Sequence, residues 1–224
     1  MASRPTFIPT NDKENLVEIK QVKFTWFPGF AKSQKLKSIQ SFHEAISKSL
    51  NKNKILEIST KSETEEGISG SAFNLKLFLK EKNYTLESLF QGSKVFKKGG
   101  PYTNLYNAKS IDAKKDERIK NSGQLVGFSF FDEKFNLNFD FYSWLYFIGL
   151  TQNMKLSKKF INYEAFTDIE FNPEKSYNCQ AYSAALFVSY INNQILNLNK
   201  EYSIEELKSI IPQKKINNFQ LELI

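Results

Sequence analysis

The stretch that decides the fold is Thr85-Leu86-Glu87-Ser88-Leu89-Phe90-Gln91-Gly92-Ser93-Lys94-Val95-Phe96. It begins with a capping residue type, carries a carboxylate in its first turn, and is followed by Gly99-Gly100-Pro101, which predicts a helix with a stop signal. At about 100° per residue, Glu87, Gln91 and Lys94 fall within an arc of about 60°, beside a mostly apolar face. A carboxylate, an amide and an amine are therefore expected together on one shoulder of the helix.

Spacing alone leaves two interpretations of this shoulder. Exposed Glu and Lys side chains are ordinary on helices, so an incidental charge pair on a solvated face explains the pattern. The same three groups also make a candidate site for acid–base or amine chemistry. Other parts of the sequence are needed to choose between these interpretations.

Composition and charge set the broad class of the protein. The chain has 224 residues, of which 41% are hydrophobic and 15% aromatic, enough for a sizeable core. The net charge is +7, from 31 basic against 24 acidic residues, and only Arg4 and Arg118 are arginines. Lysine gives diffuse attraction to phosphate rather than forked base recognition. This composition favours a polyanionic partner such as nucleic acid, although a simple compositional bias explains it equally well.

Cys179 and His43 are the only residues of their types. A single cysteine forms no intramolecular disulfide, which fits a reducing compartment, and one Cys with one His does not make the usual zinc cages. Any chemistry is thus expected on carboxylates, lysines or hydroxyls. A Ser-His-Asp triad would have to use His43, for which a structural role is the default. No apolar stretch is long enough to cross a bilayer and no signal segment begins the chain, so we expect a cytoplasmic protein without a membrane partner.

Interleaved helical and strand patterns predict an α+β fold. We expect a polar N-terminal arm over residues 1–15 and one helix-rich domain with a small mixed sheet over residues 16–224. Strands are expected at 16–27, with a bulge near Lys20, and at 55–60 and 124–131, with a further edge strand possible at 219–224. Helices are expected at 33–51, 112–121, 139–151 (capped by Asn138), 156–163, 178–195 and 203–211.

Three polar segments are open to both functional and structural interpretations. The loop at 61–70 is either a ligand rim or a connector. The loop at 97–104 either offers backbone N–H groups to a phosphate or caps a helix C-terminus. Asp168 and Glu170 share a side if their segment is extended, which suits acid–base chemistry, or pairing with lysines.

The segment Ser71-Ala72-Phe73-Asn74-Leu75, followed by the Glu87–Lys94 helix, resembles the signature of the NADAR family, in which an F-S-N-F-type segment precedes E-x-x-(F or M)-x-x-x-K. Asp168 and the helix after Asn178 resemble the carboxy-terminal motif of that family, with Ala181 in place of its second glycine. Further blocks are similar to the subgroup that accompanies DarT-type DNA ADP-ribosyltransferase toxins; these blocks are residues 24–30, 55–62, 99–103 and 178–181.

The resemblance implies an antitoxin that is an N-glycoside hydrolase, removing ADP-ribose from guanine in DNA. It implies Lys94 as the nucleophile, through a Schiff base, and Glu87 as general acid and base, with no cofactor and no metal. Asp168 would orient ribose hydroxyls or Lys94. The expected substrate-binding residues are Phe73, Asn74, Gln91, Gly100, Tyr102 and Asn178. ADP-ribosylated DNA and a cognate DarT-type toxin are the expected partners, and Trp144 is assigned either to base stacking or to the core.

Two alternatives remain beside this hypothesis. One is a non-enzymatic antitoxin that binds the toxin, or holds modified DNA through its lysines. The other stays within the family and hydrolyses a small N-glycoside, such as an intermediate of riboflavin synthesis. The net charge of +7 favours nucleic acid.

Overall fold

The structure, a computed structural model, describes residues 1–173, 178–211 and 213. It is α+β, as the sequence predicts. Contacts between residues group the chain into two compact units, and each unit is described by itself. Unit 1 comprises Met1–Ser71, Asn153–Asn172 and Asn178–Glu201. Unit 2 comprises Ala72–Gln152 together with the described residues of 173–177 and 202–224. The assignment of residues 16–224 to one domain stays a prediction, and the edge strand expected at 219–224 lies outside the described residues.

Unit 1 is built on a four-stranded mixed sheet with the strand order β2-β1-β9-β3. β1 (Ala2–Pro9) pairs antiparallel with β2 (Val17–Phe24) and with β9 (Ala165–Thr167), and β9 pairs in parallel with β3 (Ile55–Glu57). The expectation of a polar arm at residues 1–15 is therefore wrong for residues 2–9. Thr6, Phe7 and Ile8 are buried, because a strand paired on both sides carries its side chains into the core.

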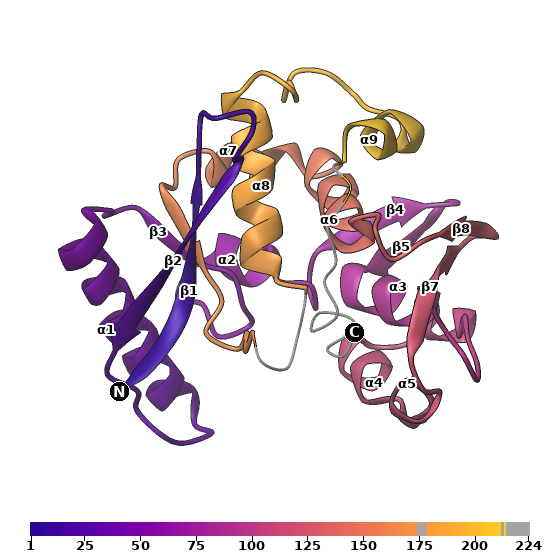
Figure 1. Cartoon of the computed structure of the whole chain (residues 1–224), viewed down its shortest axis with the longest axis horizontal. Helices are drawn as coiled ribbons and strands as arrows, with labels where there is room; N and C mark the ends of the chain where they lie inside the picture. The colour runs from indigo at the N-terminus through magenta and orange to yellow at the C-terminus, as the bar shows by residue number, and fades with distance from the viewer. Residues whose placement is uncertain (174–177, 212, 214–224) are drawn as a thin grey trace. The chain divides into compact units, whose positions relative to one another are not determined.

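Helices cover both faces of this sheet, α1 (Lys32–Leu50) on one side and α8 (Gln180–Asn192) on the other (Figure 1). Phe24 stacks on Phe42 of α1 at a centroid distance of 4.6 Å, whereas Phe7 meets Tyr182 of α8 edge-on at 5.9 Å. Val17 is buried on one face of β2, and Val22 and Phe24 are buried on the other, which explains the change of apolar phase along the strand. The expected bulge is wrong, because the register between β1 and β2 is continuous from Ala2 to Pro9.

Two short helices complete unit 1. α7 (Met154–Phe160) overlaps the helix expected at 156–163, although it begins and ends earlier. α2 (Glu65–Ser69) occupies the segment expected to be a loop, 61–70. Thr64 caps α2 by accepting a hydrogen bond from the Gly67 N–H. This local signal is obscured in the sequence by Gly67 within the helix and Gly70 at its end.

Unit 2 contains residues 85–96, the segment that carries Glu87, Gln91 and Lys94. A hairpin of β4 (Lys76–Leu79) and β5 (Lys82–Thr85) leads directly into α3 (Leu86–Ser93). The chain then enters an antiparallel sheet with the order β6-β7-β8, formed by β6 (Lys94–Phe96), β7 (Leu125–Phe130) and β8 (Glu133–Phe135). Unit 2 therefore places α3 between two strands that belong to different sheets.

The other helices of unit 2 surround this arrangement. The 3₁₀ helix η1 (Thr103–Asn107) and α4 (Ser110–Lys115) both contact α3, and α5 (Glu117–Asn121) follows. The single helix expected at 112–121 is thus two helices, which break at Asp116, where the side chain caps α5. α9 (Ile204–Ile210) has the capping box that Ser203 and Glu206 predict.

α6 (Phe141–Thr151) is the core helix of unit 2, and every residue from Phe141 to Leu150 is buried. Its N-cap is Asp140 rather than the expected Asn138. Trp144 is fully buried among Phe130 and Phe135, which assigns it to the core rather than to base stacking. No described helix has both the length and the apolar character needed to cross a membrane.

The N-cap of α3 provides a test of this arrangement. The Thr85 hydroxyl accepts a hydrogen bond from the Ser88 N–H (3.4 Å) and is hydrogen-bonded to the hydroxyls of Ser88 (2.7 Å) and Ser110 (2.8 Å). Thr85→Ala should lower the free energy of unfolding by about 1–2 kcal/mol, because a cap is lost and two buried hydroxyls lose a partner. Urea unfolding measures this loss, and Thr85→Ser, which keeps the hydroxyl, is the control. Equal stability of both variants would contradict the assignment.

Candidate active site

The helix that bears the predicted site is shorter than the sequence suggests. α3 ends at Ser93, and Lys94 has extended backbone angles (φ −63°, ψ 131°) as the first residue of β6. Lys94 pairs with Phe128 of β7, so helical hydrogen bonding gives way to sheet pairing at Lys94. Glu87 and Gln91 lie on α3 as predicted, whereas Lys94 reaches the site from a strand.

The solvated-face interpretation of α3 is wrong, because all eight residues of the helix are buried. Only 6% of Glu87 and 8% of Gln91 is exposed. The Gln91 amide donates from Nε2 to Glu87 Oε1 over 3.0 Å, which fixes the orientation of both side chains. Gln91 Oε1 is buried and has no hydrogen-bond partner within the described part of the chain. A buried acceptor without a partner is costly unless a ligand or water supplies a donor.

The Lys94 amine lies in an apolar setting next to this pair. Its Nζ is 4.8 Å from the centroid of the Phe90 ring, and burial lowers its pKa from the usual 10.5 to about 8. The carboxylate of Glu87 opposes this shift, and the positive charge of Lys114 adds to it. Lys94 therefore holds its proton much less tightly than an exposed lysine does.

A cluster of aromatic rings provides that apolar setting. Phe90 meets Tyr142 edge-on at 4.9 Å and Phe128 at 5.6 Å, and Phe128 stacks on Phe141 at 4.6 Å. The rings come from α3, β7 and α6, so the environment of Lys94 depends on how all three elements pack. These aromatic rings and the nearby carboxylate of Glu87 together form surroundings that suit a desolvated amine.

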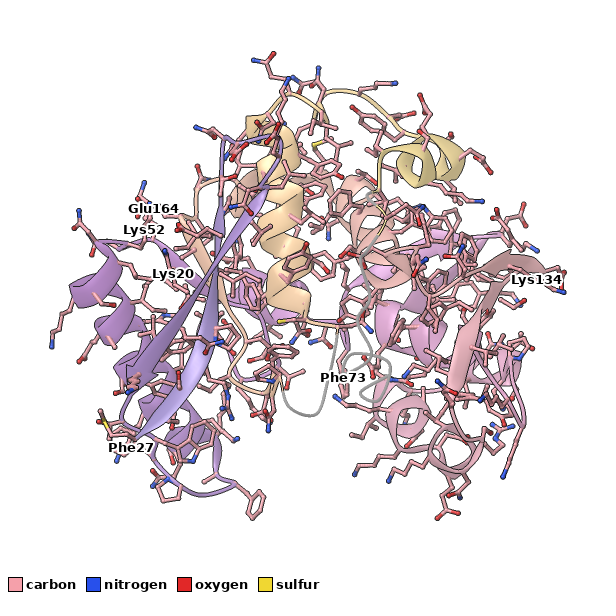
Figure 2. The ribbon with its side chains drawn as sticks, in the orientation of Figure 1. Lys20, Phe27, Lys52, Phe73, Lys134 and Glu164 are labelled. Carbon is pink, nitrogen blue, oxygen red and sulfur yellow. The ribbon has the colours of Figure 1, made fainter. Side chains whose placement is uncertain are left out.

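Phe73 and Asn74 lie in the turn before β4, and Phe73 is labelled in Figure 2. The Phe73 side chain is half-buried, and its carbonyl accepts a hydrogen bond from Ser110 Oγ over 2.9 Å. Lys114 Nζ lies 5.2 Å from the centroid of the Phe73 ring. Lys114 thus connects electrostatically to Lys94 and spatially to Phe73, a role that the helix expected at 112–121 does not indicate.

The loop after β6 has a structural role at Gly100. This residue has φ +85°, and a Cβ there would stand 2.2 Å from the carbonyl oxygen of Lys94. Glycine is therefore required for the loop to pack against the Lys94 backbone. The proposed phosphate contact of this loop is wrong for Lys97 and Lys98, whose N–H groups bond to the carbonyls of Gln124 and Ser122. The alternative of a helix C-cap is also wrong, because α3 ends at Ser93.

Tyr102 contacts two neighbours within unit 2, Arg118 and Ser122. The guanidinium of Arg118 lies 4.5 Å from the centroid of its ring, and its hydroxyl is hydrogen-bonded to Ser122 Oγ. One face of the ring is therefore covered by a cation. A ligand contact by Tyr102 stays a prediction.

Asp168 and Asn178 belong to unit 1, and a shared site with Glu87 and Lys94 stays a prediction. Asp168 is buried and accepts hydrogen bonds from Gln180 Nε2 (3.0 Å) and the Glu170 N–H (3.0 Å). The extended segment expected at 168–170 is wrong, because β9 ends at Thr167 and a turn follows. The carboxylate of Glu170 forms an ion pair with Lys35 at 3.1 Å, so the two acids have different partners.

The sequence analysis missed a buried polar network beside Asp168. Glu57 is 2% exposed, and it accepts hydrogen bonds from Thr167 Oγ1 (2.7 Å) and the Ile169 N–H (2.9 Å). His43 Nε2 lies 2.9 Å from the same Thr167 hydroxyl, and burial lowers the pKa of His43 to about 4. His43 is thus structural, as expected. The signal available in the sequence was a carboxylate enclosed by apolar residues, Leu56-Glu57-Ile58.

The pKa of Lys94 can be tested without any substrate. Reductive ¹³C-methylation followed by an NMR pH titration should show one lysine ε-amine that titrates near 8, absent in Lys94→Arg. Glu87→Gln should lower this pKa further, because it removes the charge that favours the ammonium form, and Lys114→Ala should raise it. A Lys94 signal that titrates near 10.5 would contradict the buried environment.

The fold and the geometry of α3 can now be set beside known proteins. A family model described as the DarT1-associated NADAR antitoxin matches residues 2–220, nearly the whole chain. No curated protein matches the chain. The match spans both units and includes the Glu87–Lys94 segment. The chain therefore belongs to the family of DarT1-associated NADAR antitoxins.

Proposed function

We propose that the protein hydrolyses the N-glycosidic bond between ADP-ribose and guanine in DNA. The observation that carries this proposal is the Lys94 amine, whose pKa is about 8, in electrostatic contact with the buried carboxylate of Glu87. The family supplies the biological setting, because its description links it to the DarT1 toxin. Resemblance to antitoxins of guanine-specific ADP-ribosyltransferases supplies the bond to be broken.

The chemistry requires a nucleophile at C1″ of the ribose and a proton for the departing guanine nitrogen. Neutral Lys94 attacks C1″ as the bond from C1″ to guanine breaks, and the Glu87 carboxylate relays a proton from the newly alkylated amine to the guanine nitrogen. The bond between C1″ and the ring oxygen then breaks, the ring oxygen takes the remaining amine proton, and the opened ribose is held as a Schiff base on Lys94. Water hydrolyses this imine, which releases ADP-ribose and restores the amine.

The buried surroundings favour each of these steps. Burial disfavours the ammonium form of Lys94, so a substantial fraction of the amine is neutral near pH 8. The hydrogen bond from Gln91 holds Glu87 in place, and Gln91 Oε1 remains available to accept a hydrogen bond from the substrate. Phe73 and Asn74, in the turn before β4, are the proposed wall of the ADP-ribose pocket. Asp168 is the proposed partner of the ribose hydroxyls.

ADP-ribosylated DNA is the proposed substrate, and a cognate DarT-type toxin is the proposed partner that generates it. The net charge of +7 suits a polyanionic substrate. The cytoplasm, where DNA and the toxin's product are both accessible, is the proposed compartment. Neither the proposed substrate nor the toxin requires a membrane.

Substitution of the two reactive groups tests the mechanism. Lys94→Ala should abolish release of ADP-ribose from an ADP-ribosylated oligonucleotide, because the nucleophile is lost. Glu87→Gln should lower kcat by about 10²–10⁴, the usual contribution of general acid–base catalysis. In the wild type, borohydride should trap a covalent adduct on Lys94, which peptide mass spectrometry locates. Full release by Lys94→Ala would overturn the site, and protection only at stoichiometric amounts would favour the non-enzymatic alternative.

The pH dependence provides an independent test. A nucleophilic amine must be deprotonated, so kcat/KM should rise with pH and level off above an inflection near 8. Lys114→Ala should move that inflection upwards, because the nearby cation that favours the neutral amine is removed. A profile that falls between pH 7 and 9 would be inconsistent with attack by neutral Lys94.

A further inference from the structure

A turn in unit 1 presents aromatic side chains to solvent. It comprises residues 25–31, between β2 and α1, and is called the aromatic turn below. Phe30 is fully exposed, while Trp26 and Phe27 are half-buried; Phe27 is labelled in Figure 2. An exposed phenylalanine forgoes about 2 kcal/mol of burial energy, so a fixed exposed ring calls for an explanation.

The conformation of the aromatic turn is fixed by α1. Ser41 Oγ accepts a hydrogen bond from the Thr25 N–H (3.2 Å), and Ser38 Oγ accepts one from the Phe27 N–H (3.0 Å). Gly29 has φ +130°, a conformation that side-chain-bearing residues rarely adopt. The first half of the turn is therefore anchored to α1, and Phe30, three residues beyond the second anchor, is exposed.

Cations surround the aromatic turn. Lys35 Nζ and Arg4 Cζ lie 4.8 Å and 5.7 Å from the centroid of the Trp26 ring. Residues 23–37 include four lysines and no acidic residue. The first turn of α1 also lacks acidic residues and a capping side chain, so its positive end is not neutralised locally. Lys35 also forms an ion pair with Glu170, at 3.1 Å between Nζ and Oε1.

We propose that the aromatic turn docks a single-stranded segment of nucleic acid, with a base stacked on Phe30 and phosphates held by Arg4, Lys32 and Lys35. Stacking rings interleaved with cations are the usual means of binding single strands without sequence preference. Protein-docking surfaces are instead depleted of lysine at their centre. The inference rests on the proposed function, since it gives the substrate as DNA that contains an unpaired segment.

Intrinsic fluorescence tests the surface directly. The protein has two tryptophans, and Trp144 is fully buried, so quenching by added DNA reports on Trp26. A short unmodified oligothymidylate should quench the wild-type emission. Phe30→Ala should weaken this binding about tenfold, the loss expected for one stacked base. Lys32→Ala should reduce the slope of log affinity against log salt by about one phosphate contact.

Matched variants in unit 2 serve as controls. Phe78 of β4 is 56% exposed, and Phe78→Ala should leave binding unchanged. Lys134 of β8, labelled in Figure 2, is an exposed lysine, and Lys134→Ala should likewise have no effect. Equal binding by Phe30→Ala and Phe78→Ala would overturn the proposal. So would quenching by anionic phospholipid vesicles, or by the purified toxin, without quenching by DNA.

The same variants separate this inference from the proposed function. Binding of unmodified DNA requires no bond cleavage, so a wild type that binds through Phe30 but releases no ADP-ribose would refute only the proposed activity. A wild type that releases ADP-ribose while Phe30→Ala binds and turns over normally would refute only the docking surface. If both hold, Phe30→Ala should raise KM for a modified oligonucleotide without lowering kcat.

Discussion

Burial of α3 on all of its sides is the constraint on which the candidate site depends. A helix whose eight residues are all buried places Glu87 and Gln91 inside the protein, where unpaired polar groups are costly. The hydrogen bond between them offsets part of that cost and fixes both side chains. Lys94, from the adjoining strand, is half-buried and lies beside an aromatic ring and within electrostatic reach of a carboxylate.

The same packing lowers the pKa of the Lys94 amine. An exposed lysine is almost wholly protonated at neutral pH, whereas the Lys94 amine, with a pKa of about 8, is partly neutral. The carboxylate of Glu87 limits the shift, so Lys94 keeps a pKa near the physiological range. The amine and the carboxylate to which we assign the proposed chemistry are thus brought together by one packing arrangement, in which Phe90 also takes part.

Burial also shifts pKa values in unit 1, at Glu57 and His43. Glu57 is buried in β3, and its carboxylate is satisfied by Thr167 and a backbone N–H. Burial raises the pKa of Glu57 and lowers that of His43, which shares the Thr167 hydroxyl. Both shifts favour neutral forms, so this network is suited to holding β3 and β9 together next to Asp168.

The amino-acid sequence by itself determined the α+β class, most helices, the Thr85 and Ser203 caps and the family motif, because these depend on local spacing and residue type. Tertiary structure decided where α3 ends, since pairing of β6 with β7 claims Lys94 for a strand. It also decided that β1 is a strand and that the buried face of β2 changes between Val17 and Val22. Both outcomes depend on pairing and packing between segments that are distant in sequence. The pKa of Lys94 belongs to this second group, since it arises from rings that three separate elements bring together.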